Sequence, residues 1–270
     1  MSRTLDRRAA ETRRTRSRFP LCLCASAVIA CALPLHAEDA RQIIAESQKR
    51  GHANSQKYEG ALEVIETSKK IAEKHWQYQR IGSYGDSKSI LRFTAPPEVK
   101  GVALLVVNHR DRSADQWMWT PAIGRERRIA LQDRSTRFFG TDFSFEDLEE
   151  RDLDQFDYKL DGEEDVSGFK CWRIEARPRQ SKSSQYSSSM LWIRQDHYIP
   201  VQVDNYVKDQ VVRRLKYFQY EDIQGIWTAR SLEMSDLRRK SRTLLKLGKL
   251  EYNVPMKDED FTVQALRREE

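Results

Sequence analysis

Three acidic residues, Asp142, Glu146 and Asp147, are candidates for proton transfer, and the first two have the spacing of an acid–base pair. Asp142 and Glu146 are four residues apart, so a helix would place both carboxylates on one face, as a general acid and base or as half of a metal site. No histidine accompanies them within FFGTDFSFEDLEER (138–151). The same stretch also fits a helix start, with Ser144 as N-cap and Asp147 three positions later in a capping box. We favour the cap and keep a hydrolase as an alternative.

Histidines and known motifs offer no clearer reactive site. The best metal candidate is His109 with Asp111 and Asp115 in NHRDRSADQ, but this stretch is typical of a polar hairpin loop between two strands. The sequence contains no nucleophile-elbow, zinc-protease, paired-cysteine, phosphate-loop or dinucleotide-glycine motif. We therefore predict no catalytic residue, no metal ion and no cofactor, although a triad assembled from distant residues would escape this search.

Residues 1–37 have the features of a secretory signal peptide. Seven arginines precede the apolar run LCLCASAVIACALPL, and LHA places a cleavage site after Ala37. The run is too short to span a bilayer comfortably, and no later segment approaches the ~18 consecutive apolar residues of a transmembrane helix. We expect residues 38–270 to be exported as one domain that is not transmembrane. In the alternative, VIAC resembles a lipobox, and Cys31 would carry a lipid anchor.

Removing this leader changes the charge and cysteine arguments. Residues 1–37 contribute +5 of the net charge of +6, so 38–270 carry only +1, and a nucleic-acid partner loses its main support. The clusters RERR (125–128) and RRKSR (238–242) are typical of the solvated face of a strand. The leader holds three of the four cysteines, so Cys171 cannot form an intramolecular disulfide, and we expect a buried, unreactive thiol.

One helix is predicted at the start of the mature chain, and strands are predicted after it. EDARQIIAESQKRG (38–51) has apolar residues at helical spacing, and Gly51 is typical of a helix end. From Tyr58 onward, about twelve short stretches alternate apolar and polar residues, with turn signals roughly every 8–14 residues. This pattern predicts an antiparallel meander. Since two or three helices cannot cover both faces of such a sheet, it must curl, and the curl either packs solid or encloses a cavity.

Aromatic side chains are the candidates for lining such a cavity. Two tryptophans share one face of a strand, two lie on later strands, and four phenylalanines crowd around Gly140, which we expect to adopt a positive φ. Ordinary core packing is an equally good interpretation of any single one. The candidate cavity and lid residues are Trp117, Trp119, Phe138, Phe139, Phe143, Phe145, Trp172 and Trp192.

Several segments together resemble the outer-membrane lipoprotein-sorting protein-like family, relatives of LolA and LolB. The resemblance covers about Phe93 to Leu266, and its most specific part is the run GTDFSFEDL. The matching segments are FTAPPEVKGVALLVV, DQWMWTPAIGRERRIA, DRSTRFFGTDFSFEDL, LWIRQDHYIPVQVDNY and FQYEDIQGIWTARSLEM.

The resemblance implies an α+β fold, mainly antiparallel β: a curled, incomplete barrel of about 11–12 strands with a few helices as a lid over an apolar cavity. It also implies a periplasmic, non-enzymatic carrier or acceptor of lipid or lipoprotein acyl chains, monomeric and served by an inner-membrane transporter as a possible partner. The alternative is a periplasmic interaction module, or transporter partner, with a solid core. If Cys31 is lipidated, the protein would instead be an outer-membrane lipoprotein.

Overall fold

The computed structural model describes residues 39–268, so the predicted signal peptide (1–37) and Cys31 lie outside the described residues. One α-helix, α1 (Ala40–Arg50), precedes a single antiparallel sheet of thirteen strands. The strands are β1 (Ser55–Glu66), β2 (Lys69–Ile81), β3 (Lys88–Ala95), β4 (Ala103–Val107), β5 (Asp115–Thr120), β6 (Arg125–Arg128), β7 (Phe156–Val166), β8 (Phe169–Pro178), β9 (Ser188–Arg194), β10 (Pro200–Val207), β11 (Gln210–Ile223), β12 (Ile226–Asp236) and β13 (Ser241–Tyr252). Short 3-10 helices are η1 (Tyr84–Asp86), η2 (Pro121–Ile123), η3 (Leu131–Asp133), η4 (Glu146–Leu148), η5 (Leu153–Gln155), η6 (Asp258–Asp260) and η7 (Gln264–Arg267).

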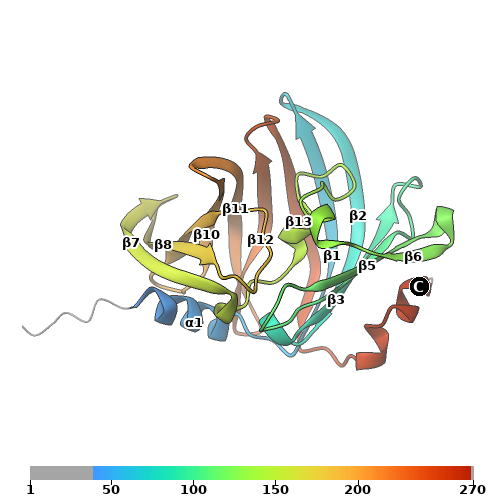
Figure 1. The fold of residues 1–270 in the computed structure, drawn as a ribbon, viewed down its shortest axis with the longest axis horizontal. Coiled ribbons are helices and arrows are strands. Elements are labelled where there is room, and N and C mark those ends of the chain that lie inside the picture. Colours follow the sequence, from blue (N-terminus) through green and yellow to red (C-terminus); the bar gives the residue numbers. More distant parts are fainter. Residues whose placement is uncertain (1–38, 269–270) are drawn as a thin grey trace, which may run out of the picture. The chain divides into compact units, whose positions relative to one another are not determined.

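Sequence neighbours pair throughout the sheet except where the first strand meets the last. The order is β6-β5-β4-β3-β2-β1-β13-β12-β11-β10-β9-β8-β7 (Figure 1), and β1 pairs with β13 in a register that sets Leu62 opposite Leu245. The connected strands β6 and β7 therefore lie at opposite edges of the sheet. We call their connection, residues 129–155, the strap. It crosses one face of the sheet, which we call the inner face.

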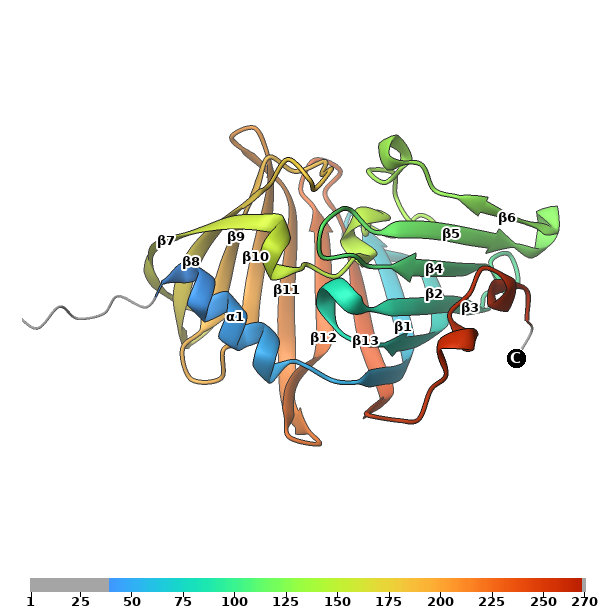
Figure 2. The same ribbon diagram turned by 60° about the horizontal axis from the view of Figure 1, so that its bottom comes forward.

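An apolar row runs across the inner face because alternate residues of each strand point to it. The residues Ile174, Leu191, Val203, Leu215 and Met234 are successive cross-strand partners from β8 to β12. The sheet is curled and open, with β6 and β7 as unpaired edges (Figures 1 and 2). The predicted curled, incomplete antiparallel barrel is confirmed, with thirteen strands instead of 11–12.

The helix α1 covers the inner face over β7–β10 (Figure 2). Asp39 is its N-cap and accepts a hydrogen bond from the Arg41 amide, and Gly51 closes it by donating to the Ser47 carbonyl at 3.0 Å. Ile43 and Ile44 are buried against the sheet. The helix predicted for residues 38–51 is thus confirmed, and it is the one α-helix among residues 39–268.

The strap covers the inner face over β1–β5. Phe138 is fully buried, stacks on Phe93 at 5.4 Å between ring centroids, and contacts Trp76, Phe139 and Phe145. A tight turn at residues 138–141 points these rings inward, with the Thr141 amide bonded to the Phe138 carbonyl at 3.0 Å. Gly140 has φ +75°, as predicted, but Phe139 also has a positive φ of +46°. This backbone geometry is costly for a residue with a Cβ, and the buried aromatic cluster offsets the cost.

Candidate ligand cavity

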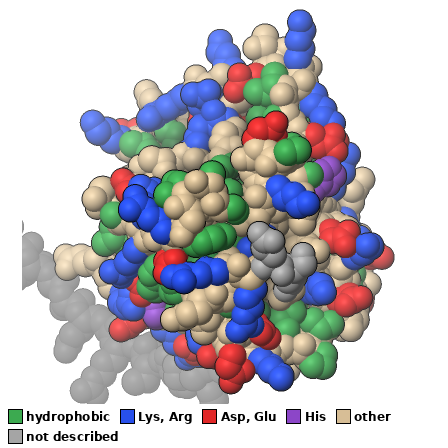
Figure 3. Space-filling model, turned by 90° about the vertical axis from the view of Figure 1, so that its right-hand side faces the viewer, with side chains coloured by type: hydrophobic (Ala, Val, Ile, Leu, Met, Phe, Trp, Pro, Cys, Tyr) green, Lys and Arg blue, Asp and Glu red, His purple; other side chains and the backbone are tan. Residues whose placement is uncertain are grey.

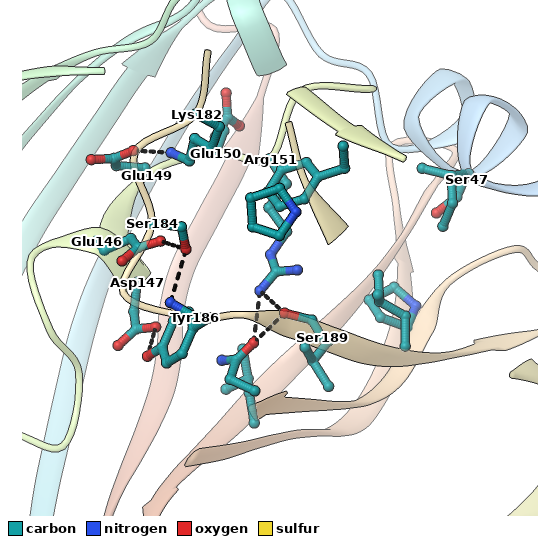
Figure 4. Close-up of a pocket in the computed structure, with 18 of the residues that line it drawn as sticks. Ser47, Glu146, Asp147, Glu149, Glu150, Arg151, Lys182, Ser184, Tyr186 and Ser189 are labelled. Carbon is teal, nitrogen blue, oxygen red and sulfur yellow. Dashed lines mark hydrogen bonds and ion pairs between the residues drawn. The ribbon is translucent and has the colours of Figure 1, made fainter. Parts of the chain in front are cut away.

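Two adjoining cavities lie between the inner face and its covers. The first has a volume of about 290 Å³ and lies beside α1. Most of the charged side chains that line the two cavities line this one (Figure 4). The second has a volume of about 270 Å³, lies over β1–β4 and β11–β13, and is mostly apolar. Asp147, Leu215 and Tyr217 line both, so these three residues form the boundary between them. Together the cavities fall within the size range of small-molecule sites, about 300–1,000 Å³.

The apolar part of the first cavity comes from the sheet and from α1. Burial raises the pKa of Tyr217 to about 12, so its phenol is neutral at physiological pH. In the second cavity, Tyr58 and Tyr78 stack at 4.7 Å, and burial raises the pKa of Tyr78 to about 12 as well. The apolar lining of the first cavity includes Ile44, Phe156, Leu191, Ile193, Val203, Leu215 and Met234. These walls suit a hydrocarbon better than a polar ligand.

The strap enters the cavity region through the predicted capping box. The Asp147 carboxylate accepts from the Ser144 amide at 2.7 Å, while the Asp147 amide donates to Ser144 Oγ at 3.4 Å. The short helix that follows is a single 3-10 turn, η4, which begins at Glu146, one residue later than Ser144 as N-cap predicts. Phe143 and Leu148, on either side of this cap, both line the second cavity. The local pattern thus predicted both hydrogen bonds between Ser144 and Asp147.

Asp147 also makes contacts that local spacing could not predict. Its carboxylate pairs with Arg213 of β11 at 2.9 Å and accepts from the Tyr186 hydroxyl at 2.8 Å. The side chains of Asp147 and Arg213 are 5% and 9% exposed. Because both charges are removed from water, each depends on the other for compensation. This buried pair fixes the strap to the sheet at the boundary between the two cavities.

A second buried ion-pair group lies one turn further along the strap. Glu149 accepts from Arg134 at 3.0 Å and from Gln116 of β5 at 3.0 Å, and it pairs with Lys182. The Glu149 and Lys182 side chains are 2% and 5% exposed. Arg134 also donates to the carbonyl of Ala114. The strap is therefore joined to the β5 side and to the loop before β9 through one carboxylate.

Two further strap carboxylates have raised pKa values. Burial raises the pKa of Glu146, which accepts from the Ser184 hydroxyl and from the Gln185 amide at 2.8 Å. Burial also raises the pKa of Glu150, and Arg80 at 3.2 Å opposes that rise. In both cases desolvation disfavours the charged form more than the nearby donors favour it.

Arg151 extends into the first cavity from the end of the acidic stretch. Its Nη2 donates to Asn205 at 2.8 Å and to Ser189 at 3.1 Å, and the guanidinium lies over the Phe156 ring at 5.4 Å. Figure 4 shows Arg151 reaching toward Ser189, with Glu146, Asp147 and Tyr186 to one side. Its Nη1 is buried and has no hydrogen-bond partner within residues 39–268.

The three carboxylates considered for catalysis are engaged in fixing the strap. Asp142 is fully buried, accepts from the hydroxyls of Ser241 and Thr243 on β13, and pairs with Arg137 at 3.2 Å. Glu146 and Asp147 do line the first cavity, as a hydrolase would require. Both oxygens of each already accept hydrogen bonds from the protein. Their geometry is that of structural anchors.

Trp117 and Trp119 lie on the other face of the sheet, which we call the outer face. They pack with Phe261 and Leu266 of the C-terminal segment that follows β13. Arg267 lies over the Trp119 ring at 6.0 Å and pairs with Glu126 of β6. Neither tryptophan lines either of the two cavities.

The remaining aromatic candidates are divided between the two faces. Phe138, Phe139 and Phe145 belong to the strap cluster, and Phe143 lines the second cavity. Trp172 packs near Tyr198 on the α1 side, at 4.8 Å between rings. Trp192 packs on the outer face with Cys171 and donates to Glu164 at 2.9 Å. Ligand contact by the eight aromatic residues stays a prediction, and Phe143 is the one that reaches these cavities.

The histidine and cysteine candidates have structural surroundings. His109 contacts Asp115 at 3.0 Å, and Arg112 and Arg128 bind the same carboxylate. Burial disfavours the charged form of Asp115, but hydrogen bonds from Arg112, Arg128 and His109 outweigh it and lower its pKa. Within residues 39–268, no three His, Cys, Asp or Glu side chains are grouped to hold a metal ion. Cys171 is buried, and burial raises the pKa of its thiol to about 11.

The basic clusters lie at the surface. Arg125, Arg127 and Arg128 of β6 are exposed, as the sequence predicted, and so are Arg238 and Arg239. Figure 3 views the end of the domain that carries β6 and the C-terminal segment, where basic side chains are interspersed with acidic ones. In the described part of the chain, no helix is long and apolar enough to cross a membrane.

Sequence reasoning missed the polar residues that matter most at the cavity. Arg151, Arg213 and Lys182 carry no local motif, because their partners lie on other strands or on the strap. Tyr158 and Tyr217 line the first cavity and alternate with solvated residues in their strands, a signal that marks the inner face but not the cavity. Within FFGTDFSFEDLEER (138–151), the first cavity is lined by Glu146, Asp147, Glu149, Glu150 and Arg151.

Comparison with known proteins places this architecture in a family. A family model described as "Uncharacterized protein" matches residues 85–268, more than half of the chain. A DUF1329 family protein from Desulfovibrio piger is 28% identical, with a TM-score of 0.80 over 84% of this chain and 97% of its own. No curated protein matches the sequence.

Two further solved structures share the fold. A putative outer membrane lipoprotein-sorting protein domain from Vibrio parahaemolyticus is 23% identical, with a TM-score of 0.80 over 85% of this chain and 98% of its own. A LolA superfamily protein from Nitrosomonas europaea is 19% identical, with a TM-score of 0.65 over 83% of this chain and 97% of its own. At these identities the likeness shows the fold alone.

Proposed function

We propose that this chain, which belongs to the family whose model matches residues 85–268 and shares the fold of LolA superfamily proteins, is a periplasmic, non-enzymatic carrier or acceptor of lipid or lipoprotein acyl chains. The observation that carries the proposal is the pair of adjoining cavities between the apolar inner face and the strap. Each CH₂ group transferred from water into such a site contributes about 0.8 kcal/mol. A hydrocarbon chain is therefore the ligand that these walls stabilise best.

The test is the lipid content of the protein as its own envelope supplies it. Protein purified from the periplasm should carry bound acyl lipid, detected by native mass spectrometry and by extraction. It should also bind a fluorescent fatty-acid probe that extracted lipid displaces. Lipid-free protein that binds no probe would refute the carrier.

The strap supplies one observation in favour of an interaction module with a solid core. Phe138, Phe145, Phe93 and Trp76 fill part of the space between the strap and β1–β5 by direct ring contacts. In that case the surface would bind a partner such as a transporter, and neither lipid nor probe would bind. The probe experiment separates the two functions.

Processing is the remaining part of the proposal. Cleavage after Ala37 would start the mature chain at Glu38 and release it on osmotic shock. If the protein incorporates labelled palmitate and the Cys31→Ser variant does not, cleavage after Ala37 is wrong. The protein would then be an acceptor anchored to the outer membrane through Cys31.

A further inference from the structure

We propose that Arg151 binds the anionic head, a carboxylate or a phosphate, of a single-chain lipid whose hydrocarbon part occupies the first cavity. This inference rests on the proposed function and adds the chemical class of the ligand. It concerns one side chain whose position the strap and two strands determine. Ser189 of β9 and Asn205 of β10 hold one end of its guanidinium.

Arg151 differs from the other basic side chains at this site in its partners. Lys182 pairs with Glu149, and Arg213 pairs with Asp147. Arg151 donates only to a hydroxyl and to an amide oxygen, and within residues 39–268 no carboxylate lies within ion-pair distance of it. Of the two basic side chains that line the first cavity, Arg151 is therefore the one that no carboxylate of the described residues pairs with.

The Arg151 guanidinium also has one N–H donor group, Nη1, that can bind an anion. Nη1 is buried from solvent and makes no hydrogen bond to any described residue, while Nη2 donates to Ser189 and Asn205. A buried, unpaired donor costs free energy, which a bound acceptor recovers. Carboxylate and phosphate oxygens match the planar fork of arginine, and charge-assisted hydrogen bonds are stronger where water is excluded.

The surroundings place hydrocarbon next to this charge. On β9, Leu191 follows Ser189 by two residues. On β10, Val203 precedes Asn205 by two residues. All four line the first cavity with Arg151. Side chains separated by two residues point to the same face of a strand, so an anion at Arg151 continues directly into the apolar row. This arrangement matches an amphiphile with one charged end.

The experiment compares ligands that differ only in the head. Hexadecanoic acid is set against hexadecanol, and a monoacylglycerol phosphate against the monoacylglycerol, each displacing a fluorescent acyl probe from the mature protein. Wild type should bind each anion about tenfold or more tightly than its neutral counterpart. Arg151→Gln should abolish that preference by weakening only the anions, and Arg151→Lys should restore part of it. Arg177→Gln, which changes an exposed arginine on β8, is the matched control and should bind as wild type does.

Each outcome decides one question. If wild type binds hexadecanoic acid and hexadecanol equally well, and the monoacylglycerol phosphate and the monoacylglycerol equally well, the proposed role of Arg151 is wrong. The proposed carrier function is then unaffected. If wild type prefers the anion in one of the two comparisons, the proposal is supported. That comparison then shows whether the bound head is a carboxylate or a phosphate. If wild type binds none of the four ligands, the carrier itself is refuted. Should Arg151→Gln fail to fold, the comparison of heads on wild type still decides.

Discussion

Asp147 gives the sharpest test of how the strap is held. Its carboxylate contacts Arg213 at 2.9 Å and Tyr186 at 2.8 Å, in a pair whose side chains are 5% and 9% exposed. A helix cap alone would contribute about 0.5–2 kcal/mol. Removing one partner of a buried ion pair costs about 3–5 kcal/mol, because the other charge stays buried and unpaired. We therefore expect Asp147→Asn to lower the free energy of unfolding by about 3 kcal/mol or more.

The measurement is urea denaturation followed by circular dichroism, with linear extrapolation to water. Glu46→Gln is the control, because Glu46 pairs with Arg50 on the partly exposed side of α1 and its loss should change the free energy of unfolding little. Arg213→Met should be as destabilising as Asp147→Asn. The double variant should lose less than the sum of the two, because it leaves no unpaired charge. Additive losses, or an Asp147→Asn loss as small as that of the control, would refute the buried pair as the anchor.

Three further outcomes follow from the packing and charges. Phe138→Ala should lower the free energy of unfolding by about 3–5 kcal/mol in the same assay, whereas Ile71→Ala, at a side chain that is 56% exposed, should change it little. A Cβ on Gly60 would lie 1.9 Å from Trp76 Nε1, so Gly60→Ala should displace that indole and shift the tryptophan fluorescence; an unchanged spectrum would contradict the close approach. Burial raises the pKa of Glu146, so its charged form disfavours the fold. The pKa of Glu146 is higher in the folded than in the unfolded protein, where it is 4.5. As the pH falls between these two values, the free energy of unfolding of wild type should therefore increase relative to that of Glu146→Gln. A decrease over that pH range would contradict the raised pKa.

The elements of this fold are readable from the sequence because they depend on local periodicity. Alternation in β13, whose buried and exposed residues follow one another almost strictly, marks a strand with one covered face. Capping at Ser144 and Asp147 is likewise a short-range pattern, and the structure contains both of its hydrogen bonds. The pairing of β1 with β13 has no local signal, since the two strands lie at opposite ends of the domain's sequence.

Alternation also cannot say which face is the inner one. Trp117 and Trp119 share a face, as predicted, but that face is covered by the C-terminal segment, whose packing could not be inferred from the strand itself. Met118, between them, points to the core under the strap. Arg213 could not be recognised as the partner of Asp147 because the two belong to segments that only the folded sheet brings together.

The strand order explains why an apolar cavity has so many charged residues along its boundary. With β1 paired to β13, β6 and β7 lie at opposite edges, so one segment has to cross the inner face (Figure 1). A crossing segment carries polar groups into a region with little water, where each requires a partner. Asp142 accepts hydrogen bonds from β13, and Asp147 forms an ion pair with Arg213 of β11. Arg151 contacts only neutral groups on β9 and β10, so the proposed anionic ligand would give this guanidinium the counter-charge that Arg213 has in Asp147.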